Sequence, residues 1–270
     1  MNEMTIPAAP VRTSLLLVAL AGPALAQSPP GAETRFSTGV MHLREGRVDL
    51  ALEEFKRAVK EDPKNPYFQK GLGLAYAKKA EELQRAAARR NPGAGPVGEW
   101  KDAISCFRKA LELNPYYVDV RNDLAAALIG SGDREAGKKE FLSAFAEPTN
   151  PTPEISARNL GQAYFEEKNY ADAVSWFRTS LNRNKAYPDP YLGIAESLDA
   201  TGRLDEAVAQ LEVGVKEIPE DASLLLALGQ AYFKAGRFAE ARGRLEEAVR
   251  KDPVGPAGRA AAEQLKALPR

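Results

Sequence analysis

Catalytic or metal chemistry in this 270-residue chain would have to begin with its single histidine and its single cysteine. A zinc site built from Cys and His side chains needs more ligands than one of each. His42 occupies a position at which three later, similar segments of the same chain carry a tyrosine, namely Tyr76, Tyr164 and Tyr232. We therefore interpret His42 as a packing residue rather than a general base, and Cys106 as a buried, inert thiol.

The remaining motifs add no chemistry. Residues 93–98 match G-x-G-x-x-G, but they follow a charged helical segment and contain Pro96, whereas a dinucleotide fingerprint follows a strand and opens a helix. The sequence has neither a nucleophile elbow nor a P-loop. The carboxylates mostly lie where solvated helix faces are expected. The sequence therefore predicts a protein that is not an enzyme and holds no cofactor or metal.

The balance of charged residues limits the classes of partner that the sequence favours. The chain carries 37 basic and 37 acidic residues, a formal net charge of zero, so no electrostatic argument favours nucleic acid or an anionic membrane surface. The hydrophobic fraction of 44% is enough for a core. One cysteine excludes an intramolecular disulfide.

The N-terminus differs in kind from the rest. Arg12 precedes an apolar run that ends in Ala24-Leu25-Ala26, which is typical of a secretory signal and its cleavage site. We predict a signal peptide over 1–26, cleavage after Ala26, a linker over 27–31 and a periplasmic or secreted protein without a stable membrane span. The alternative is an uncleaved anchor, although the run is short for a span and contains Gly22-Pro23.

The elements that position any functional side chain follow from a repeat. The six residues LGQAYF occur at 160–165 and again at 228–233, and 228 − 160 = 68 is twice 34. The slot between them, 194–199, reads IAESLD and keeps the apolar and small residues at its start. Self-similarity at such a period indicates an array of equivalent helical units.

Each repeat reads as a pair of helices. In the last one, Leu228-Gly229 and Tyr232 lie on one face of a first helix, where the glycine permits close approach of a second. Gly236 lies in the turn, and Pro253 ends the second helix. Such a hairpin leaves one apolar face that its neighbour covers.

This pattern is similar to the tetratricopeptide repeat family, whose unit of 34 residues carries Trp-x2-Leu-Gly-x2-Tyr followed by Ala, Phe, Ala and Pro. The resemblance covers roughly residues 32–253. No repeat has the Trp, and Tyr191 and Leu225 take that position in two of them. The resemblance implies an all-α fold, a right-handed α-solenoid of about six helical hairpins with a C-terminal capping helix.

The repeat boundaries follow from the register. We predict repeats at 32–65, 66–116, 117–152, 153–187, 188–221 and 222–253, and a capping helix within 254–270 with a polar outer face. The second repeat contains an insertion near 79–97, predicted as an overlong first helix and a loop. The third repeat ends in a Pro-rich stretch over 147–153, where the hairpin is expected to close irregularly.

In a solenoid of this kind the first helices line a concave groove. At 100° per residue, Gln162 lies about 160° from Leu160 and Tyr164 and so faces away from the core. Its equivalents at steps of 34 are Glu196 and Gln230, and a parallel row holds Phe165, Asp199 and Phe233. The predicted peptide-binding groove comprises Asn122, Arg158, Asn159, Gln162, Phe165, Glu166, Glu196, Asp199, Gln230 and Phe233.

These features predict an exported, non-catalytic scaffold that binds a protein or peptide partner in its groove, in cell-envelope assembly or secretion. One alternative is a self-associating module that uses the 79–97 insertion or the terminal helices. Another is an enzyme or small-ligand carrier that uses the groove, with Glu166, Glu196 or Asp199 as its working groups. The sequence leaves the partner's identity and the oligomeric state open.

Overall fold

The computed structural model describes residues 28–88 and 97–269, and within them every regular element is a helix. The all-α prediction is confirmed. The helices divide into an N-terminal unit that ends at Asn150 and a C-terminal unit that begins at Pro151. The division falls inside the Pro-rich stretch at which the sequence predicts an irregular closure. The signal-peptide prediction and the central part of the insertion lie outside the described residues.

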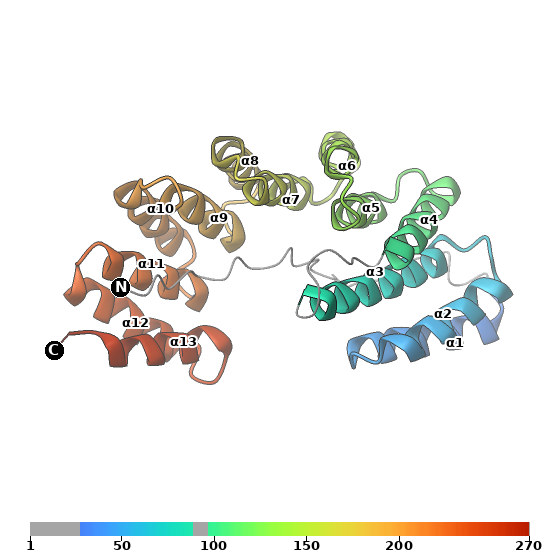
Figure 1. The fold of residues 1–270 in the computed structure, drawn as a ribbon, viewed down its shortest axis with the longest axis horizontal. Coiled ribbons are helices and arrows are strands. Elements are labelled where there is room, and N and C mark those ends of the chain that lie inside the picture. The colour runs from blue at the N-terminus through green and yellow to red at the C-terminus, as the bar shows by residue number, and fades with distance from the viewer. Residues whose placement is uncertain (1–27, 89–96, 270) are drawn as a thin grey trace. The chain divides into compact units, whose positions relative to one another are not determined.

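The N-terminal unit consists of three helical hairpins (Figure 1). Each pairs a first helix with a second that packs along it. The pairs are α1 (Pro30–Arg44) with α2 (Val48–Glu61), α3 (Pro66–Ala88) with α4 (Val97–Leu113), and α5 (Val118–Gly130) with α6 (Arg134–Ala146). At 23 residues α3 is the longest described helix, and it runs into the insertion.

The C-terminal unit repeats the arrangement and adds a final helix. Its pairs are α7 (Pro153–Glu166) with α8 (Tyr170–Arg183), α9 (Pro188–Asp199) with α10 (Leu204–Glu217), and α11 (Ala222–Lys234) with α12 (Phe238–Lys251). The last helix, α13 (Pro256–Ala267), packs against α12 and α11.

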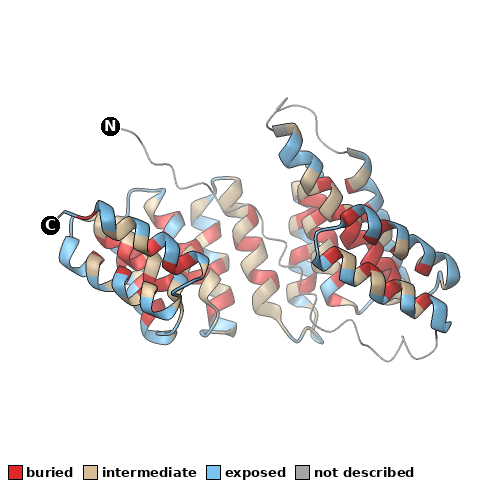
Figure 2. Cartoon of the chain, turned by 90° about the horizontal axis from the view of Figure 1, so that it is seen from below, coloured by how far each residue is buried: buried red, intermediate tan, exposed pale blue. Residues whose placement is uncertain are grey.

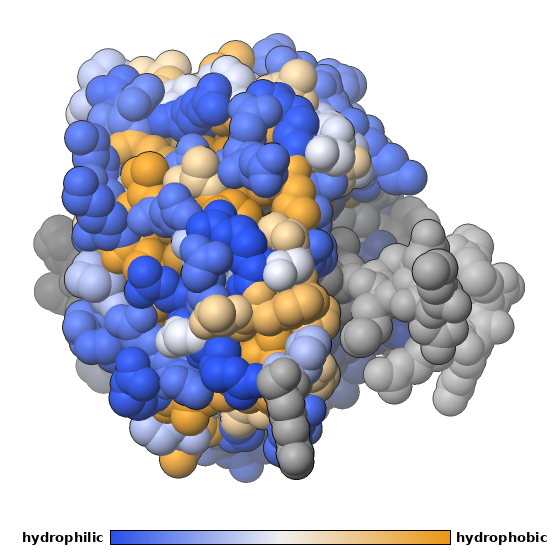
Figure 3. Space-filling model, turned by 90° about the vertical axis from the view of Figure 1, so that its left-hand side faces the viewer, coloured by the Kyte–Doolittle hydropathy of each residue, from blue (hydrophilic) through white to orange (hydrophobic). Residues whose placement is uncertain are grey.

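The outer side of α13 is polar. Arg259, Glu263 and Lys266 are exposed and Gln264 is half-buried, as expected of a helix that ends a stack. Viewed from the side that carries the C-terminal helices, the surface is mainly hydrophilic, with apolar patches between the polar rows (Figure 3).

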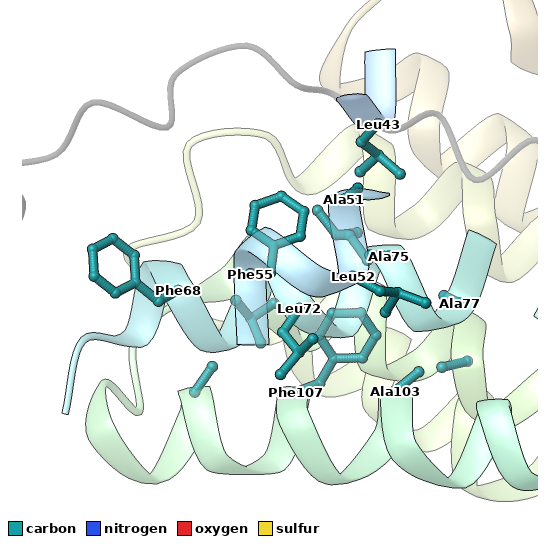
Figure 4. Packing of buried hydrophobic residues seen from close by; sticks show 14 of the residues in the cluster. Leu43, Ala51, Leu52, Phe55, Phe68, Leu72, Ala75, Ala77, Ala103 and Phe107 are labelled. Carbon is teal, nitrogen blue, oxygen red and sulfur yellow. The ribbon is translucent and has the colours of Figure 1, made fainter. Parts of the chain in front are cut away.

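The core of each unit is built from both helices of every pair, and the second helices contribute large aromatic side chains to it. Phe55, Phe107 and Phe177 occupy equivalent positions on α2, α4 and α8, and each is essentially inaccessible to water. Figure 4 shows Phe107 beside Leu72, under α3. A Cβ atom added to Gly73 would lie 2.6 Å from the Phe107 ring, so this close packing requires glycine on the first helix.

Burial follows the seams between helices, while the outward faces are exposed (Figure 2). The turns between paired helices use a left-handed residue to end the first helix. Gly46, Gly132, Gly202 and Gly236 have φ between 74° and 99°, and among the five turns of this kind that the structure describes the α7–α8 turn alone uses a side-chain-bearing residue, Lys168, at φ 61°. No described helix is long and apolar enough to span a bilayer.

Candidate partner-binding face

The first helices of the C-terminal unit form one continuous face. Helix α9 contacts both α7 and α11, whereas the second helices α8, α10 and α12 have far fewer contacts with one another. Figure 1 shows α7 and α9 on the same side of this unit. Because helices packed more closely lie on the inside of a curve, α7, α9 and α11 line the concave side of this unit, which we call the first-helix face.

Its central row consists of Gln162, Glu196 and Gln230, one from each first helix. Gln162 and Gln230 are half-buried and Glu196 is exposed. Gln162 is 3.4 Å from the Glu166 carboxylate, a long hydrogen bond. Neither Glu196 nor Gln230 has a hydrogen bond or ion pair with any described residue, so both retain their capacity for a ligand.

Glu196 is electrostatically distinctive. The residue as a whole is exposed, but its carboxyl loses part of its hydration to the surrounding protein, and this loss raises the pKa of the carboxyl. Lys234 and Arg158 act in the opposite direction, and Asp199 raises the pKa further. The pKa remains raised because the two nearby cations compensate for the lost hydration only in part.

Both of those cations have closer partners. Arg158 Nη2 donates to Asp189 Oδ2 at 2.7 Å, and only 11% of the Arg158 side chain is exposed. Lys234 forms an ion pair with Asp199. Arg158 therefore fastens α7 to α9, and Lys234 fastens α11 to α9. Asp189 and Lys234 were absent from the predicted groove, although each lies near a predicted residue of the adjacent repeat.

The aromatic row is partly structural. Phe165 packs edge-on against Tyr170 with ring centroids 5.5 Å apart, and Phe233 packs against Phe238 at 5.6 Å. Each pair joins the end of a first helix to the start of its second helix. All four rings contribute to holding the hairpins closed, which leaves only the outward parts of Phe165 and Phe233 to a partner.

The other predicted groove residues divide between the two units. Asn159 accepts a hydrogen bond from Arg158 Nη1 at 3.1 Å, and Glu166 lies at the end of α7. Asn122 belongs to the N-terminal unit, where its Oδ1 atom is buried without a hydrogen-bond partner among the described residues. The structure thus collects nine of the ten predicted residues on α7, α9 and α11.

The N-terminal unit has a different first-helix face. Lys70 on α3 is buried, with its Nζ atom 3.7 Å from Asp119 and 3.8 Å from Asp123 on α5 and 5.0 Å from the centre of the Tyr117 ring. Burial raises the pKa of Asp123 to about 6, with Lys70 opposing and Asp119 adding to the rise.

A small hollow opens between α3, α4 and α5. Ala77 lines it at the position equivalent to Phe165, and Trp100 lines it at the position equivalent to Tyr170. The indole ring packs toward Gly130, and its Nε1 atom is buried without a hydrogen-bond partner among the described residues. The complete lining is Leu74, Ala77, Lys78, Glu81, Trp100, Phe107, Asp123 and Ala127.

The two possible reactive side chains occupy packing positions. Cys106 is half-buried, and burial raises the pKa of its thiol to about 12, which disfavours the nucleophilic thiolate. His42 Nδ1 is buried without a hydrogen-bond partner in the described part of the chain. Over the described residues, no group of three or more His, Cys, Asp or Glu side chains is placed to hold a metal ion.

A family model described as the tetratricopeptide repeat matches residues 18–66, 42–95, 122–189 and 192–256. Among curated proteins, the Arabidopsis thaliana protein CTR9 homolog is 24% identical over 227 residues, covering 82% of this chain and 19% of that protein. Photosystem I assembly protein Ycf3 of Synechococcus sp. (strain CC9311) is 32% identical over 91 residues, covering 33% and 50%. The chain spans half or less of these two relatives.

Two solved structures show the same fold. PilW, described as a widely conserved type IV pilus biogenesis factor, superposes with a TM-score of 0.58 at 21% identity, covering 87% of this chain and 100% of PilW. Pseudomonas aeruginosa PilF gives 0.59 at 19% identity, covering 87% and 97%. At this identity the likeness concerns the fold alone.

Proposed function

Because the chain belongs to the tetratricopeptide repeat family, we propose that it is a non-catalytic scaffold that binds a protein partner on the first-helix face of its C-terminal unit. The matching family describes a structural repeat whose members bind protein partners, which supports an adaptor role in general. The site, the partner class and the cellular setting below are our own inferences.

One observation carries the choice of face. The central row of Gln162, Glu196 and Gln230 places three hydrogen-bonding side chains on the concave side of the unit, and two of them have no described partner. The core lies on the opposite side of each helix, so these three side chains are not needed to fill it and remain available to a ligand. Amide and carboxylate groups can form hydrogen bonds with the main chain and the polar side chains of an extended or helical segment.

The proposed setting is the cell envelope. The N-terminal 26 residues have the pattern of a secretory signal, and the fold is shared with PilW, whose description names pilus biogenesis. Ycf3 is named as an assembly protein, so a role in assembling a larger complex agrees with both. Sequencing the N-terminus of the protein from cells tests the export proposal: Gln27 as the first residue supports it, and Met1 contradicts it.

Site-specific photo-crosslinking tests the face. A photoreactive phenylalanine derivative replaces Gln162 or Gln230 in one set of variants and Val213 in another. Val213 lies on the second helix α10 and is 48% exposed, so it controls for accessibility. We expect a partner protein to be crosslinked from the first-helix face and not from Val213. Equal crosslinking from Val213, or none from either row position, would refute the proposal.

A further inference from the structure

We propose that the first-helix face reads a basic side chain of its partner at Glu196, while Gln162 and Gln230 hold the partner's main chain on either side. This inference rests on the proposed function and adds the chemistry of the ligand to it. It follows from the charges on the face, from the spacing of the row and from the contrast with the other unit.

The cation would meet a carboxylate that has no competing partner. Glu196 is exposed and forms no hydrogen bond or ion pair with a described residue. The nearest cations are held by other carboxylates, Arg158 by Asp189 and Lys234 by Asp199. A ligand cation can therefore reach Glu196 without breaking an existing ion pair.

The charges around the row favour a cation over an anion. Helix α7 contributes Arg158 and Glu166, α9 contributes Asp189, Glu196 and Asp199, and α11 contributes Lys234. These residues comprise two positive groups and four carboxylates, so their net charge is negative. Complementary charge of this kind speeds association and excludes partners of the wrong sign.

The flanking glutamines suit a polypeptide main chain. A glutamine side chain offers both a donor and an acceptor, which matches the N–H and C=O of a peptide group. Packed helices lie about 8–10 Å apart, and an extended chain advances about 3.3 Å per residue. An extended segment crossing α7, α9 and α11 would therefore advance about three residues from one row contact to the next, with the basic residue at the middle contact.

The N-terminal unit lacks this chemistry. The residues equivalent to the central row there are Val40, Leu74 and Ala126, none of which carries a polar side chain. Lys70, the counterpart of Arg158 in that unit, contacts two aspartates, so these carboxylates already have a cation beside them. Recognition of a basic side chain through a row of this kind is thus specific to the C-terminal unit.

Loss of hydration at Glu196 strengthens the argument. The pKa of this carboxyl is raised because Lys234 and Arg158 stabilise its ionised form less than the loss of hydration destabilises it. A ligand cation beside Glu196 would stabilise the ionised form further. Binding should lower the pKa of Glu196. As pH falls through the raised pKa, protonation removes the charge and the basic ligand should dissociate.

The test uses NMR titration of the purified chain with a short Gly/Ser/Ala peptide that carries one central Lys. The comparison peptide carries norleucine, which keeps the length of the side chain and removes its charge. We expect saturable shifts in α9 amides with a Kd on the order of 1 mM, and binding of the norleucine peptide about threefold to tenfold weaker. Equal affinity of the two peptides, or no shifts in α9, would overturn the proposal.

Two matched variants locate the effect. Glu196→Gln removes the charge and keeps the shape, and because Glu196 has no described partner the fold should be unaffected. Glu246→Gln makes the same change at an exposed position of the second helix α12. Glu196→Gln should weaken the binding of the Lys peptide about threefold to tenfold, and Glu246→Gln should leave the affinity for this peptide unchanged. Equal binding by the two variants would place the site elsewhere.

The outcome separates this inference from the proposed function. Crosslinking of a partner from Gln162 that is unchanged by Glu196→Gln would keep the scaffold and remove its preference for a basic side chain. Binding of the Lys peptide without any crosslinked partner would instead leave a cation-recognising face and contradict the scaffold role.

Discussion

The two units carry the same hairpin architecture but differ in how they fasten one first helix to the next. In the N-terminal unit Lys70 is buried between Asp119 and Asp123. In the C-terminal unit the equivalent residue, Arg158, forms one bond to Asp189, the equivalent of Asp119. The repeat therefore keeps a basic-to-acidic contact between successive first helices, and each unit embeds it in a different environment.

That difference extends to the rest of the face. The central row of the first-helix face is apolar in the N-terminal unit, with Val40, Leu74 and Ala126. In the C-terminal unit the same row is polar, with Gln162, Glu196 and Gln230. Ala77 leaves a hollow beside Trp100 where Phe165 packs on Tyr170. The same helical repeat thus supports one face with a buried lysine between two aspartates and another face that presents polar groups outward.

The largest expected effect comes from removing the buried cation. Lys70→Met leaves the buried Oδ2 atom of Asp123, a side chain that is 24% exposed, without its ion-pair partner, which should cost about 3 kcal/mol of unfolding free energy. Arg158→Met should cost only about 1 kcal/mol, because Asp189 is 37% exposed and water can replace the arginine. Urea unfolding of both variants measures the difference.

A second substitution provides the control. Lys70→Met combined with Asp123→Leu removes both charges and should recover most of the lost stability, since no buried charge remains. If Lys70→Met and Arg158→Met were equally destabilising, the two contacts would be energetically alike and the contrast between the units would be wrong.

A smaller effect concerns pH. Burial raises the folded-state pKa of Asp123 from 3.8 to about 6, so the folded protein holds this proton more tightly than the unfolded chain. The stabilisation of the folded state by this proton is fully present below pH about 4 and is lost as pH rises through about 6. Between these values, stability should fall by about 1–2 kcal/mol more in the parent chain than in Asp123→Asn.

Unfolding of the two proteins at a series of pH values tests this. The Asp189→Asn variant serves as the control, because it neutralises an aspartate of the C-terminal unit and leaves Asp123 in place. Parallel pH profiles for the parent chain and Asp123→Asn would contradict a titrating group at this site.

The smallest effect concerns the turns. Lys168 holds a left-handed conformation that glycine holds in the α1–α2, α5–α6, α9–α10 and α11–α12 turns. Lys168→Gly should therefore stabilise the protein by about 0.5–1 kcal/mol, because a Cβ atom is strained at positive φ. Gly202→Lys should destabilise it by about the same amount. Thermal unfolding of the two variants should shift in opposite directions, and shifts in the same direction would count against strain at Lys168.

Much of the architecture could be predicted from the sequence because the repeat is local. The period of 34 identifies helix pairs, and Gly236 or Pro253 marks where a helix turns or ends within a few residues. The angular position of Gln162 relative to Leu160 predicts a face away from the core, and in the structure Gln162 is half-buried while Leu160 is buried. The export signal and the ligand of the face stay predictions.

What only the tertiary structure decided is how side chains of different hairpins meet. The sequence by itself determined the all-α fold, the repeats and the polar character of the central row, since these depend on spacing along one chain. The burial of Lys70, the bond from Arg158 to Asp189 and the packing of Phe165 on Tyr170 depend on distances across the chain. Glu196 is without a described partner for the same reason: the packing of α7, α9 and α11 directs both neighbouring cations to other carboxylates.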